Sequence, residues 1–375
     1  MSVTDTDYGS NAANTLAKDG TLALSPSAFS VALWTANEID LTVTNSFGNH
    51  LIKIAGSFNL ASLSTTPTTL ADFINDSSLG TVSSLTNFVN GTTAPTGQGF
   101  TEAFGTPVNF PDLVSLLGFN GTSAQSVAYN TVYSGNDSYY TSNDATGIYS
   151  DAVDLYGGNN TFYENHPKLQ YVDVFYGGWG SSNPGINTAV LPGKFADYSI
   201  AQSSIYDAYT GHSDLSGGYM ITDNTGATNT LQVYQVQRLQ FAGDNTKIAL
   251  DVGNGGHAGE TAEILGAVFG AASIQAHPDY VGIGLQLLDG GMSFSQLSAL
   301  ALNVAGATTP QAVVNLLWTN LFGSAPTSAQ AAPFVQMLTS NAISTGDLAV
   351  MAENLSLNTT NINLVGLQQT GIHYV

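Results

Sequence analysis

The pattern of apolar and polar positions changes once along the chain. Upstream of about residue 250, short runs alternate apolar with polar residues and are bounded by Gly, Asn, Thr and Pro. Such alternation is typical of β-strands. Downstream, apolar residues recur at three- and four-residue spacing, as on one face of a helix. The pattern therefore predicts a mainly β N-terminal part followed by an all-α C-terminal domain.

The first part of the chain, residues 20–125, is predicted to be one β-rich domain after a flexible N-terminal segment, residues 1–19. Four runs have strand character, and two further segments fit short helices. The strand-like runs are 29–34, 39–44, 51–60 and 80–91, and the helix-like segments are 69–74 and 110–119. The pattern leaves two arrangements open for this domain, a sandwich or a stacked β-solenoid or β-roll.

Residues 126–252 are predicted to form a β-coil closed by hairpins. Three stretches rich in Tyr, Asn, Asp and Gly look like irregular copies of one unit, at 135–141, 152–165 and 171–178. A strand is expected near 195–203. A strand–turn–strand unit over 217–233 and a hairpin over 236–252 follow it.

The C-terminal region, residues 258–375, contains two copies of one unit with a period of about 52 residues, predicted to be helical-hairpin repeats. Residues 263–274 align with 315–327, and 285–302 align with 334–352. A glycine-rich joint at 252–257 precedes the first copy.

Three residues predict where helices begin in these repeats. Ser293 precedes Gln296, and Ser344 precedes Asp347, each by three positions. A hydroxyl at the N-cap and an acceptor three residues later satisfy two free backbone amides. We also expect the fourth helix to begin at Pro333, because proline fits the first turn of a helix.

Composition then restricts the partners. The 375 residues include 6 Lys plus Arg against 27 Asp plus Glu, a formal net charge of −21. A chain so acidic is not expected to bind nucleic acid or an anionic membrane surface, which both need clustered cations. No apolar run is long enough for a membrane span. With 43% hydrophobic residues the chain can still form a core, and metal cations are its natural small partners.

Cysteine is absent, which excludes disulfides and thiolate metal sites. The first residues lack the basic and apolar regions of a cleavable secretory signal. Enzyme motifs such as Gly-x-Ser-x-Gly and His-Glu-x-x-His are missing, and the six histidines lack metal-ligand spacing. We therefore predict that the protein is not an enzyme.

One region does have candidate chemistry, because it partly matches the calcium-binding repeat G-G-x-G-x-D-x-U-x, with U apolar. Aspartates in that repeat supply hard oxygen ligands for Ca²⁺. Asn occupies the aspartate position in two copies, which lowers the ligand charge. The predicted calcium ligands are Asp137, Asp154, Asn160, Asp173, Gly178 and Asn187. The alternative is a β-coil whose Asx and glycine turns bind no metal.

Residues 185–252 resemble the segment that closes the repeat region of bacterial RTX proteins, which are secreted by type I systems. The matching positions are Gly185, Thr188, Ala189, Val190, Gly193, Asp197, Tyr198, Ile200, Asp223, Val236, Arg238, Leu239, Phe241, Ala249, Leu250 and Asp251. Departures from the usual form are Asn187 for Asp, Gln237 for Glu and a different turn at 243–247.

The helical repeats resemble a domain of unknown function that often follows such segments. The first copy matches at Phe269-Gly270, Pro278-Asp279, Gly290-Gly291 and Ser293, and the second at Phe322-Gly323, Ala325-Pro326 and Leu338. An arginine usual in that domain is replaced by Ala271 and Ser324.

The resemblance implies an extracellular or cell-surface protein, exported without a cleavable N-terminal signal through an uncleaved C-terminal one. Because the chain contains no enzyme motif, we expect a structural surface protein that assembles with itself as an S-layer, filament or sheath subunit, stabilised by Ca²⁺. The alternative is a calcium-dependent adhesin that binds cell-surface polysaccharide through aromatic residues such as Trp34, Trp179 and Trp318.

Overall fold

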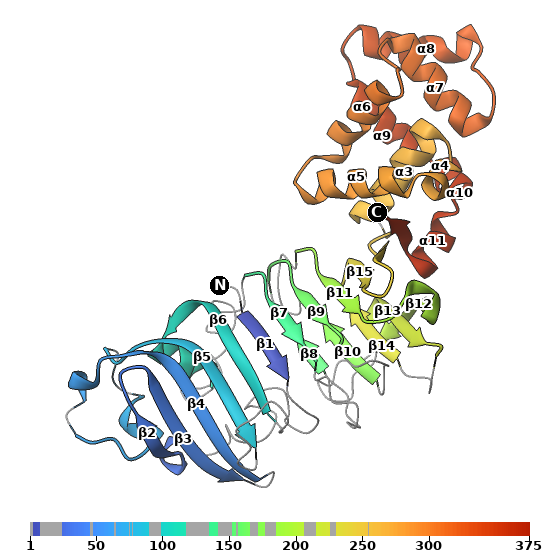
Figure 1. The fold of residues 1–375 in the computed structure, drawn as a ribbon. Helices are drawn as coiled ribbons and strands as arrows, with labels where there is room; N and C mark the ends of the chain where they lie inside the picture. The colour runs from blue at the N-terminus through green and yellow to red at the C-terminus, as the bar shows by residue number, and fades with distance from the viewer. Residues whose placement is uncertain are drawn as a thin grey trace. The chain divides into compact units, whose positions relative to one another are not determined.

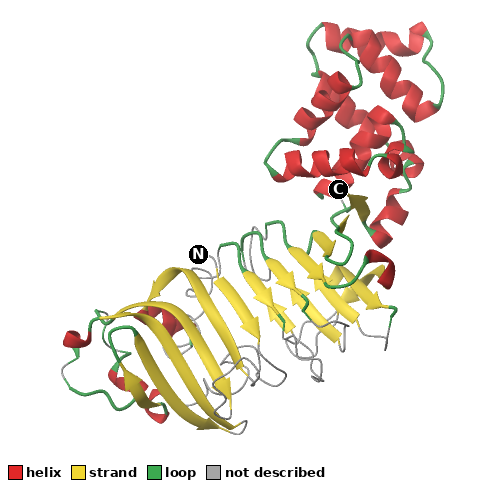
Figure 2. Cartoon of the chain, in the orientation of Figure 1, coloured by secondary structure: helices red, strands yellow, loops and turns green. Residues whose placement is uncertain are grey.

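The structure is a computed structural model. It describes residues 3–7, 25–45, 48–63, 65–74, 76, 78–89, 99–117, 135–141, 152–154, 157–165, 172–176, 185–205, 215–225, 230–253 and 255–375. They fall into two compact units. The first comprises the described residues up to 199, with 203–236 and 241–244; the second comprises 200–202, 237–240 and those from 245 onward. Figure 2 shows that strands dominate the first unit and helices the second, which confirms the predicted order of the two classes.

The first unit begins with an antiparallel meander rather than a stacked solenoid. Its strands are β2 (Ser30–Trp34), β3 (Glu38–Asn45), β4 (Gly48–Phe58), β5 (Gly80–Val89) and β6 (Gly99–Asn109), each paired with the next (Figure 1). Every predicted strand of this region is present, and β6 was not predicted. The short helices η4 (Leu70–Asp72) and α1 (Phe110–Leu116) lie in the two predicted helical segments.

One face of this meander is covered by a hydrophobic core. Alternate residues of the strands, such as Ile39, Leu41, Ile52 and Ile54, are fully buried there. They pack with a cluster contributed by α1 and the loops, comprising Phe73, Phe110, Leu113 and Val114. Two further 3-10 helices, η2 (Pro26–Ala28) and η3 (Leu60–Ser62), flank the strands. The period-2 pattern therefore places the apolar face correctly, as expected for a sheet with one buried side.

A run of parallel strands continues this sheet. Strand β1 (Val3–Asp7), within the segment expected to be flexible, pairs antiparallel with β6 and parallel with β7 (Ser138–Tyr140). Next come β9 (Thr161–Tyr163) and β11 (Thr188–Leu191), each parallel to its neighbour and without a register shift. We call residues 135–141, 157–165 and 185–191 the parallel stack.

The chain alternates between this sheet and a second one. Strands β8 (Ala152–Asp154) and β10 (Val172–Tyr176), which follow β7 and β9 in sequence, pair in parallel in the second sheet. That sheet has the order β12-β13-β14-β10-β8, with β12 (Tyr198–Ile205), β13 (Leu215–Asp223) and β14 (Thr230–Tyr234). Strands β13 and β14 are antiparallel, as the predicted strand–turn–strand unit requires.

The second unit combines a small sheet with the helices. Strands β15 (Arg238–Phe241) and β16 (Thr246–Ala249) form the predicted hairpin, and β17 (Ile372–Tyr374) pairs antiparallel with β16. The division between the units therefore lies upstream of the joint expected at 252–257. No helix among the described residues has the length and apolar character needed to cross a membrane.

The helices, labelled in Figure 1, form two sets that follow the two copies of the sequence repeat. The first set is α3 (His257–Ile264) with its π-helical continuation η6 (Leu265–Phe269), α5 (Pro278–Asp289) and α6 (Phe294–Val304). The second is α7 (Pro310–Phe322), α8 (Ser328–Thr339) and α9 (Thr345–Glu353). Three short helices, α4 (Ser273–Ala276), α10 (Ser356–Asn361) and α11 (Leu364–Thr370), complete the unit.

Counterpart helices of the two sets contact one another, α6 with α9 and η6 with α7. Such self-matching contacts are typical of units related by a two-fold axis. Ser295 and Gly346 are counterparts at this contact, where a Cβ on Gly346 would overlap the carbonyl oxygen of Ser295. The repeat read from the sequence is thus a repeat of structure.

The predicted caps are present, but the prediction for Pro333 is wrong. Ser293 accepts from the backbone N–H of Gln296, and Ser344 from that of Asp347. Helix α8 begins five residues before Pro333, at Ser328. A capping box formed by Thr327 and Gln330 starts this helix, and its two side-chain bonds outweigh the lost amide of an internal proline.

Candidate functional site

The parallel stack brings three of the predicted metal ligands into one column. Strand pairing aligns Ser138 with Thr161 and Thr161 with Thr188. The residues just before them, Asp137, Asn160 and Asn187, therefore occupy equivalent positions in three successive coils. All three are almost completely buried. We call them the inner column.

Hydrogen bonds along the inner column run from coil to coil. The Asn160 side-chain oxygen accepts from the Asp137 backbone N–H at 3.0 Å, and the Asn187 oxygen accepts from the Asn160 N–H at 2.9 Å. The Asn187 side-chain amide then donates to the backbone oxygen of Gln235 at 3.0 Å. These bonds satisfy backbone groups that would be costly to bury unpaired.

An outer column, one residue earlier in each coil, bonds in the opposite direction. The Asn136 side-chain oxygen accepts from the Asn159 N–H at 2.9 Å, and the Asn159 oxygen accepts from the Ile186 N–H at 2.8 Å. Asn136 and Asn159 are exposed to solvent. Two side-chain amides, one buried and one exposed, thus form hydrogen bonds between each pair of neighbouring coils.

Glycine precedes both columns because the coils are close there. Gly158 and Gly185 have positive φ, +94° and +70°, which side chains disfavour. A Cβ on Gly158 would overlap the carbonyl oxygen of Gly135, and one on Gly185 would overlap that of Gly158. The shared sequence is therefore Gly-x-Asx-Ser/Thr, repeated at Gly135, Gly158 and Gly185.

The hydrogen bonds give the inner column a structural role, and calcium binding by it stays a prediction. Its asparagine oxygens accept backbone N–H groups of the neighbouring coil rather than converging on one point. A calcium site needs about six to eight converging oxygens, several of them carboxylate. Among the described residues, no group of three or more His, Cys, Asp or Glu could hold a metal ion. Of the predicted ligands, Asp137, Asn160 and Asn187 therefore lie together, but in a hydrogen-bonded ladder.

The other predicted ligands are not brought into this column. Asp154 and Asp173 belong to the second sheet, where Asp154 pairs with Tyr176 and Asp173 pairs with Leu231. The two aspartates are thus three positions out of register, although the sequence suggested that they were equivalent. Gly178 lies outside the described residues. Calcium binding by these three residues stays a prediction.

Several residues on which the RTX resemblance depends form the turn after the stack. The Tyr198 hydroxyl accepts from the Gly193 N–H at 3.2 Å, and burial raises the pKa of Tyr198 to about 12. Asp197 accepts from the Lys194 N–H at 3.0 Å. Phe241 packs against Tyr198, with the two ring centroids 5.3 Å apart. The pattern in this turn therefore has a structural explanation.

Arg238 forms a buried ion-pair cluster within the second unit. Its guanidinium donates to Asp251, and through two bonds of 2.9 Å to both carboxylate oxygens of Asp289. Asp251 accepts from the His257 backbone N–H, and the His257 ring lies 2.7 Å from Asp289. The cluster joins strand β15 to the start of α3 and the end of α5. The resemblance marked Arg238 and Asp251, whereas Asp289 was missed.

A buried carboxyl group, also missed from the sequence, lies between the helical repeats. Glu353 on α9 is fully buried, and one oxygen accepts from the Ser298 hydroxyl of α6 at 2.8 Å. The other oxygen has no hydrogen-bond partner. Burial, with Glu263 and Glu260 nearby, raises the pKa of Glu353 to about 8. Burial and Glu260 raise the pKa of Glu263 to about 7. The apolar residue Leu302 occupies the counterpart position in the first repeat.

No protein-family model matches the chain, and no curated protein matches it.

Proposed function

We propose that the protein is an exported structural protein that assembles with itself at the cell surface, as a subunit of a lattice, filament or sheath. The observation that supports this proposal is the use of the amide columns. The polar residues that the sequence marks for chemistry, such as Asn160 and Asn187, join one coil of the stack to the next. Such side chains serve to build a framework.

The charge of the chain sets a condition on assembly. Copies with a net charge of −21 repel one another at low ionic strength. Assembly therefore needs cations in solution, which screen this repulsion at separations beyond about 10 Å in 0.1 M salt. Divalent calcium would favour assembly as a counterion, without a site in the inner column.

Negative-stain electron microscopy and light scattering test this proposal on the full chain. The samples contain calcium, magnesium or a chelator at matched ionic strength. We expect large ordered particles with either divalent ion and smaller species with the chelator. A chain that stays monomeric at high concentration with calcium would contradict self-assembly. If that monomer instead bound an array of glycans, the adhesin alternative would replace it.

A further inference from the structure

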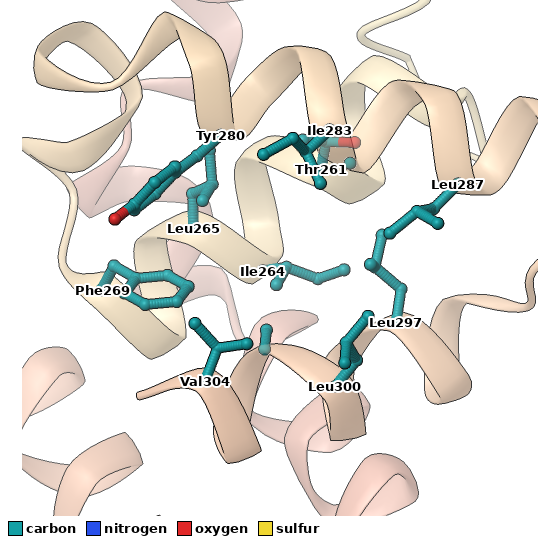
Figure 3. Close-up of a pocket in the computed structure, with 12 residues that line it drawn as sticks. Thr261, Ile264, Leu265, Phe269, Tyr280, Ile283, Leu287, Leu297, Leu300 and Val304 are labelled. Carbon is teal, nitrogen blue, oxygen red and sulfur yellow. The ribbon is translucent and has the colours of Figure 1, made fainter. Parts of the chain in front are cut away.

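The helical unit contains two open apolar grooves, one in each repeat. The first has a cavity of about 170 Å³ between α3, η6, α5 and α6 (Figure 3). Its lining includes Ile264, Phe269, Ile283, Leu297, Leu300 and Val304. The second has a cavity of about 310 Å³ between α7, α8 and α9. Its lining includes Leu317, Phe322, Phe334, Leu348, Met351 and Leu355.

The two grooves are counterparts, residue by residue. A shift of 53 positions takes Ile264 to Leu317 and Phe269 to Phe322. A shift of 51 positions, which also relates the caps Ser293 and Ser344, takes the other four residues of the first groove to those of the second. The internal repeat has therefore kept the groove as well as the fold.

Both grooves expose large apolar side chains to solvent. Val304 is 69% exposed and Ile283 54% in the first groove; Met351 is 51% and Phe322 50% in the second. Val365, at 72%, is equally exposed but lies outside both linings. Contiguous exposed apolar residues with polar surroundings mark binding surfaces in soluble proteins.

Charge indicates what would cover these grooves. Downstream of Lys247 the sequence has no lysine or arginine. Asp279 precedes Ile283 by four residues and Asp347 precedes Met351 by four. Both aspartates are exposed, and the Asp347 carboxylate also accepts from the Ser295 and Ser344 hydroxyls. Residues four apart share a helix face, so each groove has a carboxylate beside its lining. A second copy of this acidic surface or an anionic lipid is disfavoured, whereas a cationic partner is attracted.

We propose that each groove binds an amphipathic helix whose apolar anchors are flanked by lysine or arginine. Helices dock in apolar grooves through residues at i, i+3, i+4 and i+7. The exposed lining residues would receive those anchors, and Asp279 and Asp347 would face the basic positions. One chain would then bind two helices. This inference does not rest on self-assembly, because it concerns a different partner.

The test uses the full chain and a synthetic peptide of Leu and Lys, about 18 residues or five helical turns long, with Leu at helical spacing. Two control peptides have the same composition in scrambled order, or Glu in place of Lys. Isothermal titration calorimetry should show two sites for the first peptide and no measurable binding of either control. Equal binding of the scrambled or the Glu peptide would overturn the proposal.

Paired variants assign the sites. The double variant Ile283→Ser with Val304→Ser should lose the first groove's site and keep the second. The double variant Met351→Ser with Leu355→Ser should lose the second groove's site and keep the first. Circular dichroism checks that these changes at solvent-exposed positions leave the fold intact, and Val365→Ser should bind like the unmodified chain. Asp279→Asn should weaken the first site about three-fold, as for an exposed ion pair. Two unaltered sites in the groove variants would overturn the proposal.

Sedimentation velocity without peptide separates a second copy from a foreign helix. The groove variants should sediment like the unmodified chain. If they convert an oligomer of the unmodified chain to monomer, the grooves are an interface between copies, and the proposal of a cationic helix is wrong.

Discussion

The two units bury polar side chains in different ways. In the parallel stack, which also buries the carboxyls of Asp137 and Glu164, the neutral Asn160 and Asn187 accept backbone N–H groups of the neighbouring coil. In the helical unit, the buried polar groups include an ion-pair cluster and a carboxyl. Arg238 lies between two aspartates, and Glu353 has one hydroxyl partner. Neutral amides keep their hydrogen bonds at every ordinary pH, whereas buried ionisable groups link stability to pH.

This contrast indicates that different interactions set the stability of the two units. The stack repeats a short unit whose register is set by hydrogen bonds, so its stability should respond to the loss of single amides. The helical unit repeats a longer element with an apolar core, so its stability should respond to charge.

Replacing Arg238 by methionine should have the largest effect. The change leaves Asp251 and Asp289 facing each other without their shared cation, and removal of one partner of a buried ion pair costs about 3–5 kcal/mol. Urea unfolding of the helical unit, followed by far-ultraviolet circular dichroism, measures this loss. The control Arg238→Lys keeps the charge and should lose less. Equal stability of Arg238→Met and the unmodified chain would show that the ion-pair cluster does not stabilise the helical unit.

Raising the pH should destabilise the helical unit. The pKa of Glu353 is about 8 in the folded chain, against 4.5 when exposed. Its protonated form is therefore favoured by folding. The associated stability is fully present below about pH 4.5 and is lost as pH rises through about 8. Unfolding at pH 5, 7 and 9 measures it.

The variant Glu353→Gln is the control for this pH effect. It keeps an acceptor for Ser298 and removes the titration, so most of the pH dependence should disappear. Glu263, whose pKa is raised to about 7, should leave a smaller dependence in the same direction. An unchanged pH slope in Glu353→Gln would contradict the assignment.

Shortening one amide of the inner column should destabilise the stack. Asn160→Ala removes the acceptor of the buried Asp137 N–H, and a buried unsatisfied donor costs about 1–3 kcal/mol. The matched control is Asn136→Ala in the outer column, where water can replace the lost acceptor for the exposed Asn159. That variant should change stability by less than about 0.5 kcal/mol. Equal losses in the two variants would show that burial does not distinguish the columns.

Much of the fold could be predicted from the sequence because it depends on local patterns. Strand alternation and the capping residues Ser293 and Ser344 are features of consecutive residues. The prediction from Pro333 was wrong because the capping box that begins at Thr327, six residues earlier, decides where α8 begins. Strand β6 was missed because Gly99, Gly105 and Pro107 interrupt its pattern.

The hydrogen-bonded columns of the stack could not be predicted from local sequence in the same way. Successive Gly-x-Asx-Ser/Thr units begin 23 and then 27 residues apart, at Gly135, Gly158 and Gly185, so no fixed period reveals them. Asp154 and Asp173 share similar neighbours, yet backbone pairing sets them three positions apart. Register is a property of the paired strands and cannot be read from either strand alone.

Hydrogen exchange of the Asp137 and Asn160 backbone amides tests most directly whether side-chain amides, rather than an ion, hold the stack together. The measurement compares the full chain in chelator and in calcium. We expect slow exchange of both amides in chelator, unchanged by calcium, because Asn160 and Asn187 accept these N–H groups without a metal. Rapid exchange in chelator that becomes slow only after calcium is added would contradict it.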